Sequence, residues 1–143
     1  MKKEICFDMD GTIANLYGEK NWLERLLNED ETPYANAKPL VNMARLAKAL
    51  KKAQNKGYEI KIISWLCKNG KKEYNEKVIK AKKEWLKKHL PSVKWNAIEI
   101  VEYGKPKSEI GNGILFDDEK PNRDEWGKGA YEPNEMWKVL ATV

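Results

Sequence analysis

Short apolar runs alternate along this chain with longer segments in which apolar residues recur at every third or fourth position. The short runs are typical of buried strands, and the longer segments are typical of amphipathic helices. The runs predict four strands, at residues 4–9, 58–64, 97–101 and 113–116. The periodic segments predict four helices: residues 21–28, a helix that opens at Pro39 and stops at Gly57, residues 71–90 and residues 133–140.

Strands that alternate with helices predict a parallel sheet with helices on both of its faces. The expected fold class is therefore α/β, a Rossmann-like three-layer sandwich with a mostly parallel sheet. Residues 29–38 are polar and predict irregular chain. No repeat, linker or low-complexity stretch divides the 143 residues, so we expect a single domain over residues 1–143.

Composition narrows the class of protein further. Apolar residues make up 41% of the chain, enough for one core, whereas 34% of the residues are charged. No segment approaches the ~20 consecutive apolar residues of a membrane-spanning helix, and Glu4 follows the N-terminus too closely for a signal peptide. We therefore expect a cytoplasmic protein with no membrane contact. With only two cysteines, Cys6 and Cys67, neither a disulfide scaffold nor a zinc site is expected.

The chain carries a net charge of +5, which suits a phosphorylated partner or a nucleic acid without distinguishing between them. Nine lysines from Lys68 to Lys88, Lys82 among them, lie on or just before the predicted helix over residues 71–90. Such a run most often forms a solvated helix face, and the alternative is a nucleic-acid contact. His89 is interpreted as a surface or helix-end residue rather than a catalytic one.

Residues that suit phosphate chemistry follow the predicted strands. In open parallel sheets, ligands bind beyond the carboxyl ends of the strands. The residues at or near those ends are Asp8, Asp10, Ser64, Asp117 and Asp118, with Lys105 and Lys107 in the loop before the last strand. Crowded carboxylates repel one another unless a cation binds them. Hard oxygen ligands in small number suit Mg²⁺, which also shares its coordination shell with a substrate phosphate.

Four motifs in this order resemble those of the haloacid dehalogenase superfamily of phosphatases. Asp8-Met9-Asp10-Gly11-Thr12 resembles the first motif of the superfamily, and Ser64 resembles the second. A lysine before the last strand resembles the third, and Asp117-Asp118 resembles the fourth. The ordered set spans most of the chain. The resemblance implies the fold of that superfamily and the Mg²⁺-dependent hydrolysis of a small phosphorylated substrate.

The resemblance also implies a role for each residue that matches a motif. Asp8 would attack phosphorus and form an aspartyl-phosphate, and Asp10 would act as general acid and then as general base. The Mg²⁺ ligands would be the Asp8 and Asp117 carboxylates, the backbone carbonyl of Asp10, and Asp118 directly or through water. Ser64 would bind the phosphoryl oxygens, together with substrate-binding Gly11 and Thr12.

Two positions need separate treatment. The catalytic lysine of the third motif is either Lys107 or Lys105, and Lys107 is favoured because its spacing to Asp117 fits the pattern better. The first motif usually continues with an acid near position 15, where this chain has Asn15, to which no role is assigned.

The substrate is less well defined by the sequence. Residues 82–91 and 114–118 are similar to the 5′(3′)-deoxyribonucleotidase family, which implies a nucleotidase-like enzyme. That family has a larger helical cap than the short insertion over residues 13–38 provides. Trp22 and Trp65 flank the predicted site, and either could stack on a base or sugar ring of the substrate, with Trp65 as the candidate substrate-binding residue. A nucleic-acid end and a sugar phosphate are the alternatives, and the oligomeric state is not predicted.

Two non-enzymatic classes also remain open. A receiver-type phosphoacceptor domain likewise clusters Asp, Ser or Thr, and Lys on a parallel sheet. It carries its acceptor Asp in mid-chain, whereas the strand that ends at Ser64 offers none. The second class is a nucleic-acid-binding module that uses the basic helix.

Overall fold

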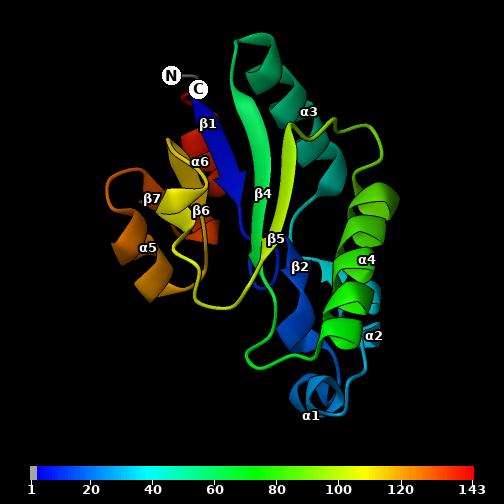
Figure 1. The fold of residues 1–143 in the computed structure, drawn as a ribbon. Coiled ribbons are helices and arrows are strands. Elements are labelled where there is room, and N and C mark those ends of the chain that lie inside the picture. Colours follow the sequence, from blue (N-terminus) through cyan, green and yellow to red (C-terminus); the bar gives the residue numbers. More distant parts are fainter. Residues whose placement is uncertain (1–2) are drawn as a thin grey trace.

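The computed structural model describes residues 3–143. Met1 and Lys2, part of the N-terminal segment that was considered as a signal peptide, lie outside the described residues. A five-stranded sheet runs through the molecule in the order β5-β4-β1-β6-β7 (Figure 1). The strands are β1 Glu4–Phe7, β4 Glu59–Trp65, β5 Ala97–Val101, β6 Ile114–Phe116 and β7 Ala130–Tyr131. Neighbouring strands pair in parallel throughout, which confirms the expected α/β class.

Side chains of the central strands are buried on both faces of the sheet, as expected where helices cover both faces. On one face, Ile5, Phe7, Ile60 and Ile62 belong to the main core. That core is completed by three helices: α3 (Met43–Asn55), α4 (Lys72–His89) and α6 (Met136–Leu140). On the other face, a smaller cluster of Cys6, Ile63 and Leu115 packs against α5 (Lys120–Trp126) and Ile110, which follows the 3₁₀ helix η2 (Lys107–Glu109).

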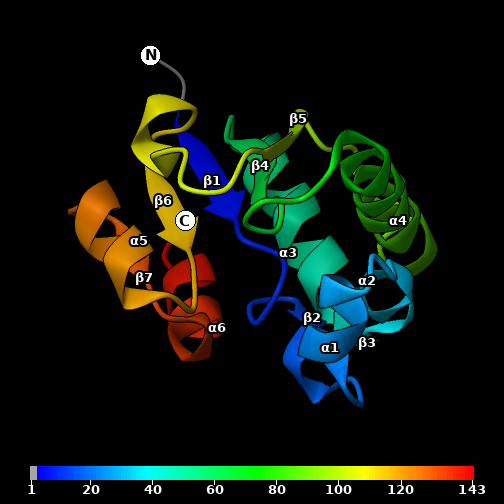
Figure 2. The ribbon, with the colours of Figure 1, turned by 60° about the horizontal axis from the view of Figure 1, so that its bottom comes forward.

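A short insertion separates β1 from α3 and lies beside α4 (Figure 2). It contains β2 (Ala14–Asn15), η1 (Leu16–Gly18), α1 (Trp22–Leu27), α2 (Thr32–Asn36) and β3 (Lys38–Pro39). β2 and β3 pair antiparallel and close the insertion at its base. Leu16 and Tyr34 of the insertion are buried against Tyr74, Val78 and Ala81 of α4. The insertion is therefore anchored on α4 by its own small apolar cluster.

Two of the predicted elements differ from the structure. The helix expected to open at Pro39 begins at Met43, because Pro39 pairs with Ala14 in the β2–β3 ladder. The helix is instead capped by Asn42, whose side chain accepts a hydrogen bond from the Arg45 backbone N–H at 2.9 Å. Residues 29–38, expected to be irregular, contain α2, which has a proline in its first turn.

The remaining elements follow the prediction closely, apart from short ones that it missed. β5 has the predicted bounds, and α4 lies within one residue of its predicted ends. The predicted helix over residues 133–140 is a 3₁₀ turn (Pro133–Glu135) that continues into α6. β7 and α5 were not predicted. Within residues 3–143, no helix is both long and apolar enough to cross a membrane.

Candidate active site

The candidate site lies where the chain changes direction across the sheet. From β1 the chain moves outward to β4 and β5, and it then returns to β6 on the opposite side of β1. Ligands of such sheets bind at this switch point, beyond the carboxyl ends of the strands. Phe7 of β1 and Phe116 of β6 are register partners, so the residues that follow them, Asp8 and Asp117, leave the sheet side by side.

The turn after β1 holds the first two predicted motif residues close to the last ones. The backbone N–H groups of Thr12, Ile13 and Ala14 all donate to the Met9 carbonyl, at 3.0–3.1 Å. Thr12 is fully buried, and its hydroxyl donates to Oδ2 of Asp8 at 3.2 Å. Its contact is therefore with the Asp8 carboxylate, which it helps to orient.

Gly11 in the same turn has φ +84°, in the left-handed region that glycine adopts without strain. A Cβ atom at this position would overlap the carboxylate of Asp118 and the ring of Tyr17. Gly11 is thus required both for the turn and for the close approach of the Asp118 loop.

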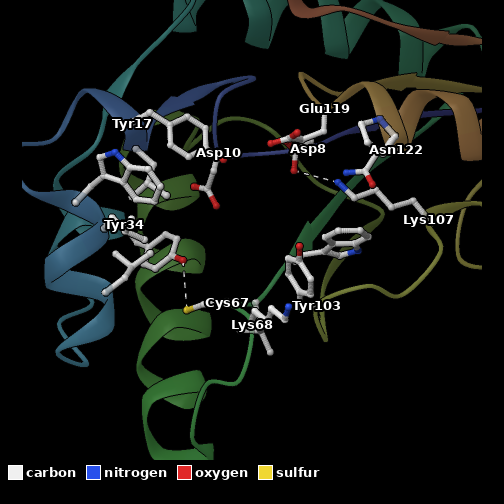
Figure 3. Close-up of a pocket in the computed structure, with 17 residues that line it drawn as sticks. Asp8, Asp10, Tyr17, Tyr34, Cys67, Lys68, Tyr103, Lys107, Glu119 and Asn122 are labelled. Atoms are coloured by element: carbon white, nitrogen blue, oxygen red, sulfur yellow. Dashed lines mark hydrogen bonds and ion pairs between the residues drawn. The ribbon is translucent and has the colours of Figure 1, made fainter.

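Lys107 bridges the carboxylates at the ends of two neighbouring strands. Its side chain is 1% exposed, and its Nζ lies 3.0 Å from Oδ1 of Asp8 (Figure 3). The same Nζ lies 2.7 Å from Oδ2 of Asp117. Burial acts to lower the pKa of Lys107, but the charges of Asp8 and Asp117 and their hydrogen bonds outweigh it and raise the pKa. Lys107 is therefore protonated at neutral pH.

Lys105 has different contacts from Lys107. Its Nζ lies 3.8 Å from Glu109, and its backbone carbonyl accepts a hydrogen bond from Nε1 of Trp65 at 2.8 Å. Of the two candidate lysines, Lys107 reaches the carboxylates, whereas Lys105 fixes the orientation of the Trp65 indole.

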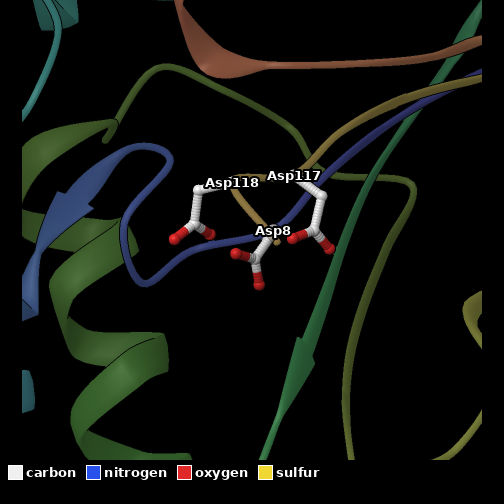
Figure 4. Close-up of side chains that lie close together, drawn as sticks. All are labelled: Asp8, Asp117 and Asp118. Atoms are coloured by element: carbon white, nitrogen blue, oxygen red, sulfur yellow. The ribbon is translucent and has the colours of Figure 1, made fainter. Parts of the chain in front are cut away.

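Asp8, Asp117 and Asp118 converge on one point (Figure 4). Each offers a carboxylate oxygen, and these oxygens lie within 4.8 Å of one another. Burial, together with the hydrogen bond and charge of Asp8, raises the pKa of Asp118 to about 8. Three hard oxygen donors that repel one another form a set that fits Mg²⁺.

Asp10 contributes to the site in another way. Its Oδ2 pairs with Nζ of Lys82 at 3.0 Å, so its carboxylate is engaged outside the three-aspartate cluster.

Asp117 is held by residues that the sequence analysis did not identify. Nδ2 of Asn122 donates to Oδ2 of Asp117 at 3.2 Å, and the backbone N–H of Glu119 donates to Oδ1 at 2.9 Å. Asn122 lies in the first turn of α5, which is short and polar and shows little helical periodicity. Pro121, at the start of that turn, was the available signal for a helix here.

Lys82 corrects the expectation that the lysines of α4 are solvated. Its side chain is 1% exposed, and its Nζ lies 2.7 Å from Oγ of Ser64, which is itself fully buried at the end of β4. The signal was its position, four residues from both Val78 and Leu86 on the buried side of the helix. The exposed lysines of this helix include Lys80 and Lys83.

A cavity of about 610 Å³ opens above Asp8, Asp10 and Lys107. Its lining is largely apolar and aromatic, from the insertion on one side and from the loops after β4 and β5 on the other (Figure 3). The aromatic lining residues are Tyr17, Trp22, Tyr34, Trp65 and Tyr103. Trp22 and Trp65 were predicted near the site, whereas the three tyrosines were not. Gly11, Thr12 and Ser64 are not among the lining residues, since the last two are buried behind the cavity wall.

Comparison with known proteins places the fold. No protein-family model and no curated protein matches the chain. Among solved structures, it is similar to the D,D-heptose 1,7-bisphosphate phosphatase from Burkholderia thailandensis, with a TM-score of 0.50 and 14% sequence identity. The match covers 99% of this chain and 86% of that chain. At this identity the likeness shows a shared fold, and function has to be argued from the site.

The raised pKa of Asp118 predicts that its carboxylate binds a proton near neutral pH, and this proton competes with a cation for the same oxygens. Without a cation, the folded chain keeps this proton up to about pH 8, whereas a free Asp side chain has a pKa of 3.8. Between these values the folded state binds more protons than the unfolded state, so its stability falls as pH rises. In chelator, the Tm should fall more steeply between about pH 5 and pH 9 for the parent than for Asp118→Asn. Excess Mg²⁺ should flatten the parent curve, and parallel curves for the two proteins in chelator would contradict the assignment.

The tight turn predicts a specific effect of adding a side chain at Gly11. Backbone strain alone should make Gly11→Ala less stable by about 1–3 kcal/mol. The overlap of the added Cβ with Asp118 should add a further loss of stability. Gly57→Ala is the matched control, since Gly57 has φ +98° but nothing within 4 Å of the added Cβ. Melts with and without Mg²⁺ should show a reduced Mg²⁺ effect for Gly11→Ala alone. Equal losses of stability and of the Mg²⁺ effect in both variants would contradict the close approach.

Proposed function

We propose that this chain is a Mg²⁺-dependent phosphatase that hydrolyses phosphate monoesters through an aspartyl-phosphate on Asp8. The observation that carries the proposal is the placement of Asp8. Its carboxylate lies at the base of a cavity, oriented by Lys107 and Thr12, and beside two further carboxylates. The fold shared with a phosphatase and the order of the four sequence motifs support the same assignment.

In the first step, a carboxylate oxygen of Asp8 attacks phosphorus, and the bond from phosphorus to the leaving oxygen breaks. Asp10, which also lines the cavity, enters this step protonated on Oδ1, while its Oδ2 accepts from Lys82, and it donates that proton to the leaving oxygen. Lys107 and Thr12 hold the nucleophile in one orientation, so that little reorganisation is needed when charge shifts onto the phosphoryl oxygens.

In the second step, water attacks phosphorus in the aspartyl-phosphate while Asp10 accepts its proton, and the free Asp8 carboxylate and inorganic phosphate are released. Bound Mg²⁺ would be held by Asp8, Asp117, Asp118 and the Asp10 carbonyl, and it would supply positive charge to the phosphoryl oxygens. Asn122 and the Glu119 N–H keep the Asp117 carboxylate aimed at this position.

We propose a nucleotide-like substrate, because the cavity offers aromatic surface on two sides. Trp65 packs edge to face on Tyr103, with 5.1 Å between ring centroids, and Trp22 packs in the same way on Tyr17 at 4.9 Å. Stacking of a base on such rings contributes about 1–3 kcal/mol. The insertion is anchored on α4, so it forms one fixed wall of the cavity and leaves room for a bulky leaving group.

The proposed roles of Asp8 and Lys107 lead to a direct test. With para-nitrophenyl phosphate and excess Mg²⁺, Asp8→Asn should abolish turnover, because the amide is not a nucleophile. Lys107→Met should lower kcat by about 10²–10³-fold, since it removes charge stabilisation from the reaction centre. Lys105→Met removes an ammonium two residues away that faces Glu109, and it should retain near-parental kcat. Circular dichroism should establish that each variant is folded. Near-parental turnover by folded Asp8→Asn, or equal losses in the two lysine variants, would overturn these roles.

The aromatic walls predict a preference for substrates with a base. Catalytic efficiency should be higher for deoxynucleoside monophosphates than for hexose phosphates. Tyr103 is 54% exposed, so Tyr103→Ala should leave the fold intact and lower efficiency on nucleotides by about 5–100-fold. The control Leu27→Ala removes another exposed apolar side chain, one that is 76% exposed and lies outside the cavity, and it should have no effect. A preference for hexose phosphates that Tyr103→Ala leaves unchanged would refute the nucleotide assignment.

A further inference from the structure

Lys82 is a second buried ammonium group at the site, and the mechanism above assigns it no role. It reaches the end of β4 from the middle of α4, and its Nζ has three acceptors. These are Oγ of Ser64 at 2.7 Å, the Trp65 carbonyl at 2.8 Å and Oδ2 of Asp10 at 3.0 Å. The ring of Tyr34, 5% exposed, covers the ammonium at 4.8 Å.

These contacts fix the orientation of the ammonium group. A lysine ammonium has three N–H donors and no acceptor, and here each donor has its own oxygen. Ser64 and Trp65 belong to the central strand β4, so two of the three bonds tie Lys82 to the rigid sheet. The third bond therefore holds the Asp10 carboxylate at a defined place relative to that sheet.

The carboxylate held in this way is the one that faces the cavity. The Asp10 side chain is 15% exposed and lines the cavity, whereas Lys82 is enclosed and does not. Asp10 lies in the turn after β1, and within residues 3–143 its side chain has no hydrogen-bond or ion-pair partner other than Lys82. Without Lys82, rotation of the Asp10 side chain would be limited only by packing.

We propose that Lys82 is a positioning residue: it holds Oδ2 of Asp10, so that Oδ1 can carry the proton that passes to the leaving oxygen of the substrate. This inference rests on the phosphatase function proposed above. A buried ion pair is by itself a weak source of stability, because well-packed apolar residues often replace one without loss. The pair instead links Asp10, at the proposed reaction centre, to Lys82, which is itself hydrogen-bonded to the sheet.

The test compares two substrates of nearly equal shape whose leaving groups differ in how much they need protonation. The leaving group of para-nitrophenyl phosphate is a stable anion, whereas that of para-nitrobenzyl phosphate must be protonated as it departs. The ratio of kcat/KM for the benzyl ester to that for the phenyl ester therefore reports proton donation by Asp10. Lys82→Met should lower this ratio by about 10–100-fold, in the direction expected for Asp10→Asn.

Lys83→Met is the matched control, because Lys83 is the next residue of the same helix and is exposed. It should leave the ratio unchanged. A role of Lys82 in stability or in phosphate binding alone would lower kcat/KM for both esters equally and leave the ratio at its parental value, which would overturn the proposal. A parent protein with no Mg²⁺-dependent activity on either ester would instead refute the phosphatase function itself.

A second variant keeps the test decisive if Lys82→Met does not fold. Asp10→Asn combined with Lys82→Met leaves neither an unpaired carboxylate nor an unpaired ammonium in the pair, which is the milder way to remove a buried ion pair. If Lys82 acts through Asp10, the double variant should have the same ratio as Asp10→Asn alone. A further fall of the ratio in the double variant would show that Lys82 acts independently of Asp10, contrary to the proposal.

Discussion

The Lys107 ammonium between Asp8 and Asp117 is the interaction on which the site depends. β1 and β6 are neighbours in register, so each delivers a carboxylate to the same place at the edge of the sheet. Two buried carboxylates at this separation would repel each other, and desolvation would add several kcal/mol for each ion. A buried ammonium within 3.0 Å of both makes the arrangement compatible with a closed core. Thr12 and Asn122 then fix which oxygen faces which partner.

The same solution is used twice in one site. Lys82 lies between Asp10 and Ser64 in much the way that Lys107 lies between Asp8 and Asp117. Around the cluster itself, the three aspartates Asp8, Asp117 and Asp118 and the one lysine Lys107 leave two negative charges in excess, which is the charge that one divalent cation balances. In its absence, the proton on Asp118 takes over part of that balance. Lys107 thus sets the net charge of the cluster, and the cation and the proton compete for the charge that remains.

The sequence predicts the sheet and its acidic edge because both follow from local pattern. An apolar run such as β5 can be recognised as a strand from its residues alone. The acids that follow β1 and β6 become neighbours because those two strands pair in parallel. What the sequence does not reveal depends on tertiary contacts. Lys82 looks like any lysine of a basic helix, and only packing of α4 against β4 and Tyr34 buries its ammonium. Similarly, α5 is short and polar and β7 has only two residues, so neither shows a period in the sequence. Pro39 suits the first turn of a helix, and only its pairing with Ala14 in the folded chain rules that out.

The pairing of β2 with β3 has a consequence for how this fold can vary. Ala14 and Pro39 meet across two short strands, so the chain that leaves the turn after β1 returns to nearly the same point. The entropy of closing a loop grows only slowly with its length. The segment between these two residues can therefore be lengthened, shortened or exchanged with little effect on the sheet. Under the proposed function this segment is the wall that faces the substrate, so substrate preference can change while the turn that carries Asp8 and Asp10 stays the same.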